Sequence, residues 1–214
     1  MAAVRDFAES KDGLKLRYEI RGHGEPVALI MGFSGSGRGW GEAFLKLMEA
    51  RFTIFVIDNR GTGESDKPDA EFTLSDMAAD VATVLDHAKT PRVHIFGISM
   101  GGMIAQEFAL HHADKLSCLI LGCTHFGGAG VAQSPPEIVA AVMAGTNATP
   151  AQQHQQLQAV FCDNTIENRG EVVEKHNRIR AQYPIPPYAL RGRFRRSAPS
   201  TRVRAWVRFA SRRW

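Results

Sequence analysis

The seven residues 96–102, FGISMGG, constrain the fold of this 214-residue chain more than any other stretch. A short apolar run with strand propensity ends just before them, and apolar residues at helical spacing begin just after them. The motif Gly-x-Ser-x-Gly in this setting predicts a sharp strand-to-helix turn with Ser99 at its tip. Glycine is needed at Gly97 and Gly101, because side chains two residues either side of Ser99 would collide in so tight a turn. A chance turn of small residues is the competing interpretation, and the flanking elements and Gly102 argue against it.

Short strand-like runs alternate with helical patterns along residues 1–124. Several of these runs are apolar almost throughout, which is typical of strands buried on both faces of a parallel sheet. Two earlier runs are joined by a turn with Gly13 and predict an antiparallel hairpin. We therefore predict an α/β fold with a mostly parallel sheet and an N-terminal antiparallel hairpin. The expected hairpin strands are residues 5–10 and 14–21, and the later strands are residues 27–31, 52–57, 93–96 and 116–121.

Helical patterns fill the gaps between these strands. One covers residues 40–50, one begins at the capping sequence Thr73-x-x-Asp76, and one follows Ser99. After Thr124 the strand pattern stops, and two or three amphipathic helices are expected at residues 136–144, 151–161 and 171–183. The expected division is a core at residues 1–125, a helical lid or cap at residues 126–190 and a tail at residues 191–214.

The tail differs from the rest of the chain in charge. Residues 191–214 hold nine Arg, no Lys and no acidic residue, whereas residues 1–190 hold 17 basic and 22 acidic residues. An Arg-rich tail with interleaved aromatic residues is one way to bind nucleic acid or an anionic membrane. We favour a frameshifted or otherwise mis-terminated product, because Arg, Ser, Pro, Ala and Trp prevail when a GC-rich gene is translated out of frame. An unusual but genuine terminus is the third interpretation.

The cysteine residues and the hydropathy of the chain indicate where the protein is located in the cell and whether it holds a cofactor. The three residues Cys118, Cys123 and Cys162 are an odd number and match no common zinc spacing, so we expect neither a disulfide framework nor a metal site. No stretch approaches the roughly 18 apolar residues of a membrane-spanning helix. We expect a cytoplasmic protein that is neither secreted nor embedded in a membrane, with no cofactor.

A second glycine-rich segment, residues 31–37 with the sequence MGFSGSG, ends another apolar strand. We expect the backbone N–H of Phe33 to face the same pocket as that of Met100, which provides two donors for a negatively charged carbonyl oxygen. Ser99 would also lie beside a helix N-terminus, which favours negative charge. A P-loop is excluded, because no Gly-Lys-Ser/Thr follows, while a flexible turn stays open. A third loop, residues 58–66, is expected to act mainly as a structural tether.

These segments in order, over about residues 5–124, resemble the α/β-hydrolase fold family, and the pattern is similar to its enol-lactone hydrolases, small esterases and C–C bond hydrolases. The resemblance implies Ser99 as the nucleophile, the N–H groups of Phe33 and Met100 as the oxyanion hole, and Gly97 and Gly101 as the glycines of the nucleophile turn. It implies hydrolysis of an ester, a lactone or a related carbonyl compound through an acyl-enzyme. One departure is Met31, which stands where the family usually has His.

The family places the acid and the His of its catalytic triad after the nucleophile, on loops beyond the lid. Here no Asp follows Asp163, no His follows His176, and 27 residues follow Pro187. The sequence offers two substitutes for the missing base: His125, or His176 with Asp163 or Glu171. For each of these histidines we favour the interpretation of a surface or packed side chain. We therefore expect a serine hydrolase lineage without its last strands, inactive because the triad is incomplete. Its partner is a small-molecule ester or lactone, with no nucleic acid expected; binding through the Arg-rich tail is the alternative.

Overall fold

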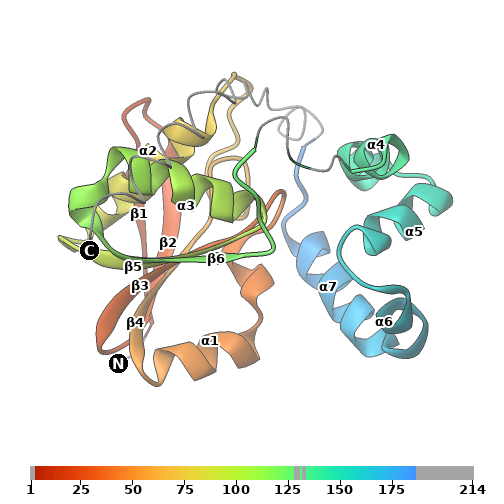
Figure 1. Cartoon of the computed structure of the whole chain (residues 1–214), viewed down its shortest axis with the longest axis horizontal. Helices are drawn as coiled ribbons and strands as arrows, with labels where there is room; N and C mark the ends of the chain where they lie inside the picture. Colours follow the sequence, from red (N-terminus) through yellow and green to blue (C-terminus); the bar gives the residue numbers. More distant parts are fainter. Residues whose placement is uncertain (1–2, 128–130, 132–133, 187–214) are drawn as a thin grey trace.

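The computed structural model describes residues 3–127, 131 and 134–186 (Figure 1). Within them six strands form one sheet in the order β1-β2-β4-β3-β5-β6. The pairs β3–β4, β3–β5 and β5–β6 are parallel, and the two pairs that involve β2 are antiparallel. The prediction of an α/β fold with a mostly parallel sheet is confirmed. The strands are β1 (Val4–Glu9), β2 (Lys15–Gly22), β3 (Glu25–Ile30), β4 (Phe52–Ile57), β5 (Val93–Ile98) and β6 (Leu116–Gly122).

The N-terminal hairpin is formed as predicted. β1 and β2 pair in antiparallel register, with Phe7 opposite Arg17. Gly13 in the connecting turn has a φ of 81°, a conformation that glycine adopts without steric cost. β2 continues the sheet onto β4, so the hairpin covers one edge of the parallel strands.

Helices cover both faces of the sheet because its central strands are apolar on both sides. α2 (Leu74–His87) and α3 (Met100–His111) lie on one face, and α1 (Glu42–Glu49) lies on the other (Figure 1). The larger core contains Ile30, Ile95 and Phe108, and the smaller one under α1 contains Leu29 and Leu45. α2 begins with the capping box predicted at Thr73 and Asp76, in which each residue binds the other's backbone N–H.

Four further helices lie to one side of these layers (Figure 1). They are α4 (Pro136–Ala144), α5 (Pro150–Gln158), α6 (Asp163–Asn168) and α7 (Gly170–Gln182). Three correspond to the predicted helices, and the short α6 was not predicted. The assignment of this segment as a lid, and the boundaries of the three regions, stay predictions. The tail at residues 191–214 lies outside the described residues.

None of the helices in the described ranges is long and apolar enough to cross a membrane.

The strand β6 forms the end of the sheet opposite to the hairpin. Its Ile120 and Leu121 are 45% and 42% exposed. Ile120 stands opposite Phe96 of β5, on which Trp40 and Phe44 pack. An edge strand with exposed apolar side chains is prone to pair with other chains.

We predict that the chain self-associates through β6. Ile120→Lys should reduce association, because a charged side chain on an edge strand opposes edge-to-edge pairing. The matched control is Leu47→Lys, at a residue that is 74% exposed on α1, a helix that packs on β2 and β4, and it should leave association unchanged. Sedimentation velocity measures both variants. A parent chain that sediments as a monomer and melts cooperatively would contradict this prediction.

Candidate active site

Ser99 lies at the turn between β5 and α3, as the motif predicts. Its backbone has φ 52° and ψ −124°, a conformation that residues with side chains rarely adopt. The turn is held by neighbouring backbone, because Ser99 N–H donates to the Gly122 carbonyl at 2.9 Å and the Thr124 hydroxyl donates to the Ser99 carbonyl at 2.6 Å. β5 thus delivers Ser99 to the carboxyl edge of the parallel strands, where open α/β sheets bind ligands.

The glycines around Ser99 allow backbone segments to approach one another closely. A methyl group placed on Gly97 would lie 2.3 Å from the carbonyl oxygen of Gly101, and one placed on Gly101 would lie 2.1 Å from that of Ile30. A methyl group on Gly32 would lie 2.9 Å from the Ser99 Cβ. The predicted need for glycine at positions 97 and 101 therefore has a geometric basis: the first turn of α3 packs directly on β3 and β5.

The glycine-rich segment after β3 lies next to Ser99. Gly32 and Phe33 line the same cavity as Ser99. Met100 is buried at the first position of α3, where backbone N–H groups have no partner within the helix. The assignment of Phe33 and Met100 as oxyanion donors stays a prediction.

The loop at residues 58–66 is tied by buried polar contacts. Asp58 accepts backbone N–H groups from Gly37 at 2.7 Å and Glu64 at 2.9 Å. Burial raises the pKa of Asp58, and these two donors oppose the rise. Arg60 pairs with the buried Asp80 at 2.6 Å. Because its charged groups are engaged within the protein, the loop serves as a tether, as the sequence suggested.

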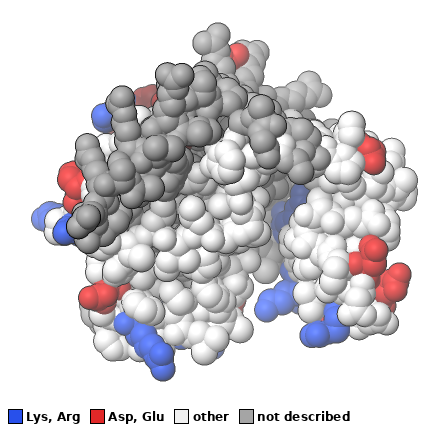
Figure 2. Space-filling model, in the orientation of Figure 1, with Lys and Arg blue, Asp and Glu red and all other residues white. Residues whose placement is uncertain are grey.

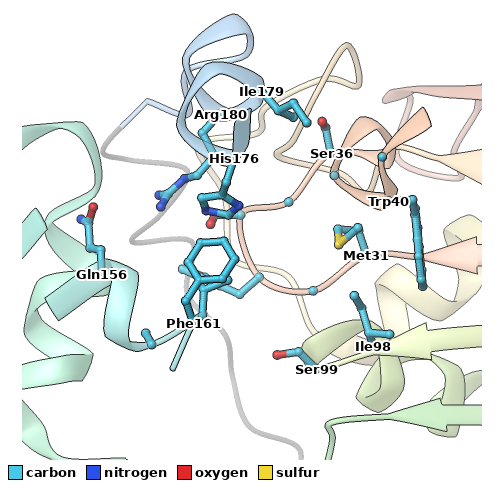
Figure 3. A pocket seen from close by; sticks show the side chains of 18 of the residues that line it. Met31, Ser36, Trp40, Ile98, Ser99, Gln156, Phe161, His176, Ile179 and Arg180 are labelled. Atoms are coloured by element: carbon cyan, nitrogen blue, oxygen red, sulfur yellow. The ribbon is translucent and has the colours of Figure 1, made fainter. Parts of the chain in front are cut away.

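A cavity of about 840 Å³ opens between Ser99 and residues of α4, α5 and α7. Figure 3 shows Ser99, Ile98 and Met31 on the core side, and Phe161, His176 and Arg180 on the opposite side. Residues of one face of α7 line the cavity at helical spacing: Val172, Lys175, His176, Ile179, Arg180 and, just after the helix, Tyr183. This spacing was visible in the sequence, but which face is turned inward depends on how α7 packs.

Helix α7 is also fastened to the core beside the cavity. The Tyr183 hydroxyl donates to Glu64 Oε1 at 3.1 Å, and Arg38 lies 3.5 Å from the same oxygen. The Arg38 guanidinium stacks over the Tyr183 ring at 5.4 Å from its centroid. These contacts join the loop of residues 58–66 to the end of α7, and sequence reasoning missed them because Tyr183 and Glu64 are far apart in the chain.

His176 is the one histidine of the described ranges that lines the cavity. Its Nε2 is buried without a hydrogen-bond partner, and its ring meets Phe161 edge-on. Burial, with a smaller effect from Arg180, lowers the pKa of His176, so the imidazole is neutral at neutral pH. Of its proposed acidic partners, Glu171 pairs with Arg169 at 2.6 Å and Asp163 accepts a hydrogen bond from Gln158. The structure does not bring either carboxylate to His176.

The other candidate base, His125, is exposed, and its Nδ1 accepts the Gly127 N–H at 3.0 Å.

Cys123 was not singled out for this site, yet it lines the cavity with φ 39° at the end of β6. No group of three His, Cys, Asp or Glu side chains in the described ranges is placed to hold a metal ion.

The model of the α/β hydrolase fold family matches residues 25–185. The chain belongs to the α/β-hydrolase fold family. The resemblance to this family that the sequence indicated is thereby confirmed. The matched range includes Ser99, the loop after β3 and all of α7.

Among curated members of the family, the chain is 37% identical over 111 residues to "Putative carbamate hydrolase RutD" of Variovorax paradoxus. That match covers 50% of this chain and 42% of the relative, so less than half of the relative's length is spanned. Among solved structures, a hydrolase from Pseudomonas aeruginosa is 26% identical with a TM-score of 0.74, over 88% of this chain and 70% of that one. A protein described as an N-acyl homoserine lactone degrading enzyme is 28% identical with a TM-score of 0.69, over 86% and 69%.

We predict that Gly101→Ala destabilises this α/β-hydrolase core. The added methyl group would meet the backbone of Ile30, which cannot move without disturbing β3, and such overpacking costs about 1–3 kcal/mol. Gly170→Ala is the matched control, because a methyl group there meets nothing within 4 Å. Denaturant unfolding measures the free energy of both variants. Equal stability of Gly101→Ala and the parent would show that the close approach around Ser99 is not required.

Proposed function

We propose that this chain carries the acyl-transfer site of a serine hydrolase lineage, with Ser99 as its nucleophile and an ester, a lactone or a related carbonyl compound as its substrate. One observation carries the proposal: Ser99 occupies a strained strand-to-helix turn that opens into a cavity of about 840 Å³. The relatives named for carbamate hydrolysis and lactone degradation support it, because both reactions begin with attack on an acyl carbon.

In the proposed reaction the Ser99 Oγ bonds to the acyl carbon, the acyl C–O bond breaks, and the proton from Oγ ends on the released oxygen. An ester thus loses its alcohol, whereas a lactone ring opens to a hydroxyacyl group that stays bound to Ser99. Water then hydrolyses the acyl-enzyme and releases the acid. The N–H groups of Phe33 and Met100 are the proposed donors to the oxyanion, and one such donor is worth about 2.7–4 kcal/mol in other serine hydrolases. A base must take the Oγ proton in the first step, because a serine hydroxyl is a weak nucleophile otherwise.

We infer that turnover by this chain is low, because no base is paired with Ser99. All eight His and every Asp and Glu of the sequence fall in the described ranges, so this inference does not depend on the other residues. No hydrogen bond joins a His of that part of the chain to the Ser99 hydroxyl, and His176 has no carboxylate to orient it. Loss of a triad member lowers turnover up to about a millionfold in a well-studied serine protease.

The alternative function, binding of nucleic acid or an anionic membrane through residues 191–214, concerns residues outside the described ranges. The cytoplasmic location also stays a prediction.

Prolonged treatment with a fluorophosphonate should label the chain slowly and at Ser99, as read by peptide mass spectrometry. Ser99→Ala should abolish labelling, whereas Ser34→Ala, which changes another serine of the same cavity, should not. Labelling at a residue other than Ser99, or none at all, would contradict the assignment of the nucleophile.

Hydrolysis of p-nitrophenyl acetate by the parent chain should not exceed that by Ser99→Ala, because no base is paired with Ser99. Rapid turnover that Ser99→Ala abolishes would contradict the inference of low activity. In that case His176→Ala tests whether the one histidine in the cavity wall is the base.

A further inference from the structure

The cavity that contains Ser99 has a positively charged wall. Two cations, Lys175 and Arg180, line it from α7, and no Asp or Glu of the described ranges is among the lining residues. Figure 2 shows Lys and Arg side chains, in blue, in the hollow between the core and the helices α4–α7. In Figure 3, Arg180 extends from α7 past His176 toward Gln156, which also lines the cavity.

Arg180 has no counterion in the protein. Its guanidinium takes part in no ion pair or hydrogen bond in the described part of the chain, whereas that of Arg178, on the same helix, pairs with Glu174 at 3.3 Å. The residues outside that part include no Asp or Glu, so no side-chain carboxylate of this chain is left to pair with Arg180. Arg180 is partly buried, and burial lowers its pKa, although a guanidinium stays protonated.

A partly buried cation without a partner is costly, and proteins pair such groups or use them for binding. The planar guanidinium presents N–H groups in a fork that matches the two oxygens of a carboxylate, and the Lys175 ammonium adds a second positive charge. Gln156, another polar residue of the wall, is already engaged, because its amide donates to the carbonyls of Ala141 and Gly145. Arg180 is therefore the side chain of this wall whose unpaired charge an anionic ligand pairs with best.

We propose that the substrate carries a carboxylate away from the carbonyl that Ser99 attacks, and that Arg180, assisted by Lys175, binds this carboxylate. The proposal rests on the proposed function for the identity of the reacting carbonyl. It narrows the substrate class from esters and lactones in general to half-esters, lactone acids and related monoanions. The carboxylate would hold the ligand at the α7 side of the cavity, and the carbonyl would then lie toward β5 and α3.

Binding measurements test the proposal without requiring turnover. The probes are monomethyl glutarate, with one methyl ester and one carboxylate, and dimethyl glutarate, its neutral counterpart. Isothermal titration calorimetry with the full chain should give an affinity for the monoester at least about tenfold higher, as expected for a charge-assisted hydrogen-bonded pair. Equal affinities for the two probes would overturn the proposal. Tighter binding of inorganic phosphate than of the monoester would overturn the assignment of a carboxylate.

Variants assign the preference to Arg180. Arg180→Gln should abolish the tenfold preference, and Arg180→Lys should keep part of it, because lysine offers charge without the planar fork. Arg178→Gln is the matched control: it removes the same charge from the same helix, at a side chain that is 69% exposed, and should leave the preference intact. Circular dichroism melting checks that each variant is folded. If Arg180→Gln fails to fold, the other two variants decide the assignment. An unchanged preference for the monoester in folded Arg180→Lys, together with loss of that preference in Arg178→Gln, would overturn it.

The same titrations in Ser99→Ala separate this inference from the proposed function. The preference for the monoester should persist there, because Arg180 and not Ser99 carries it. Failure of fluorophosphonate to label Ser99 would overturn the proposed nucleophile and leave the charge preference standing. Labelling of Ser99 in a chain that binds both glutarate esters equally would overturn the carboxylate site alone.

Discussion

The close packing of backbone around Ser99 is the constraint on which the rest of the site depends. Gly97 and Gly101 let the first turn of α3 rest on β5 and on the last carbonyl of β3, and no side chain fits in either place. This contact holds Ser99 at a positive φ, aimed out of the carboxyl edge of the sheet. It also brings Gly32 against the Ser99 Cβ, so that the loop after β3 becomes a neighbour of the proposed nucleophile.

Charged groups divide into two kinds around this centre. In the core they are paired: Arg60 with Asp80 and Asp12, and Asp58 with two backbone N–H groups, so they stiffen the loops that frame the cavity. On α7 the cation Arg180 faces the cavity without a protein counterion. A buried charge that is satisfied within the protein supports structure, whereas one left unsatisfied in a cavity wall is available to a ligand.

The core of the fold could be predicted from local patterns. Apolar runs identified β3 to β6, Gly13 identified the hairpin, and Thr73 with Asp76 identified the start of α2. Each of these signals acts over a few residues and depends on backbone sterics or a local hydrogen bond. The short helix α6 was missed, because six residues carry too little periodicity to distinguish a helix from a loop.

The strand-to-helix turn at Ser99 could be predicted from the residue order alone, because the spacing of its glycines is a local steric requirement. Three further properties depend on how distant segments pack: which face of α7 meets the cavity, the lack of a carboxylate beside His176, and the lack of a counterion for Arg180. These are properties of residues about 80 positions from Ser99, and the packing of α7 against the core, fastened by Tyr183 and Glu64, sets them.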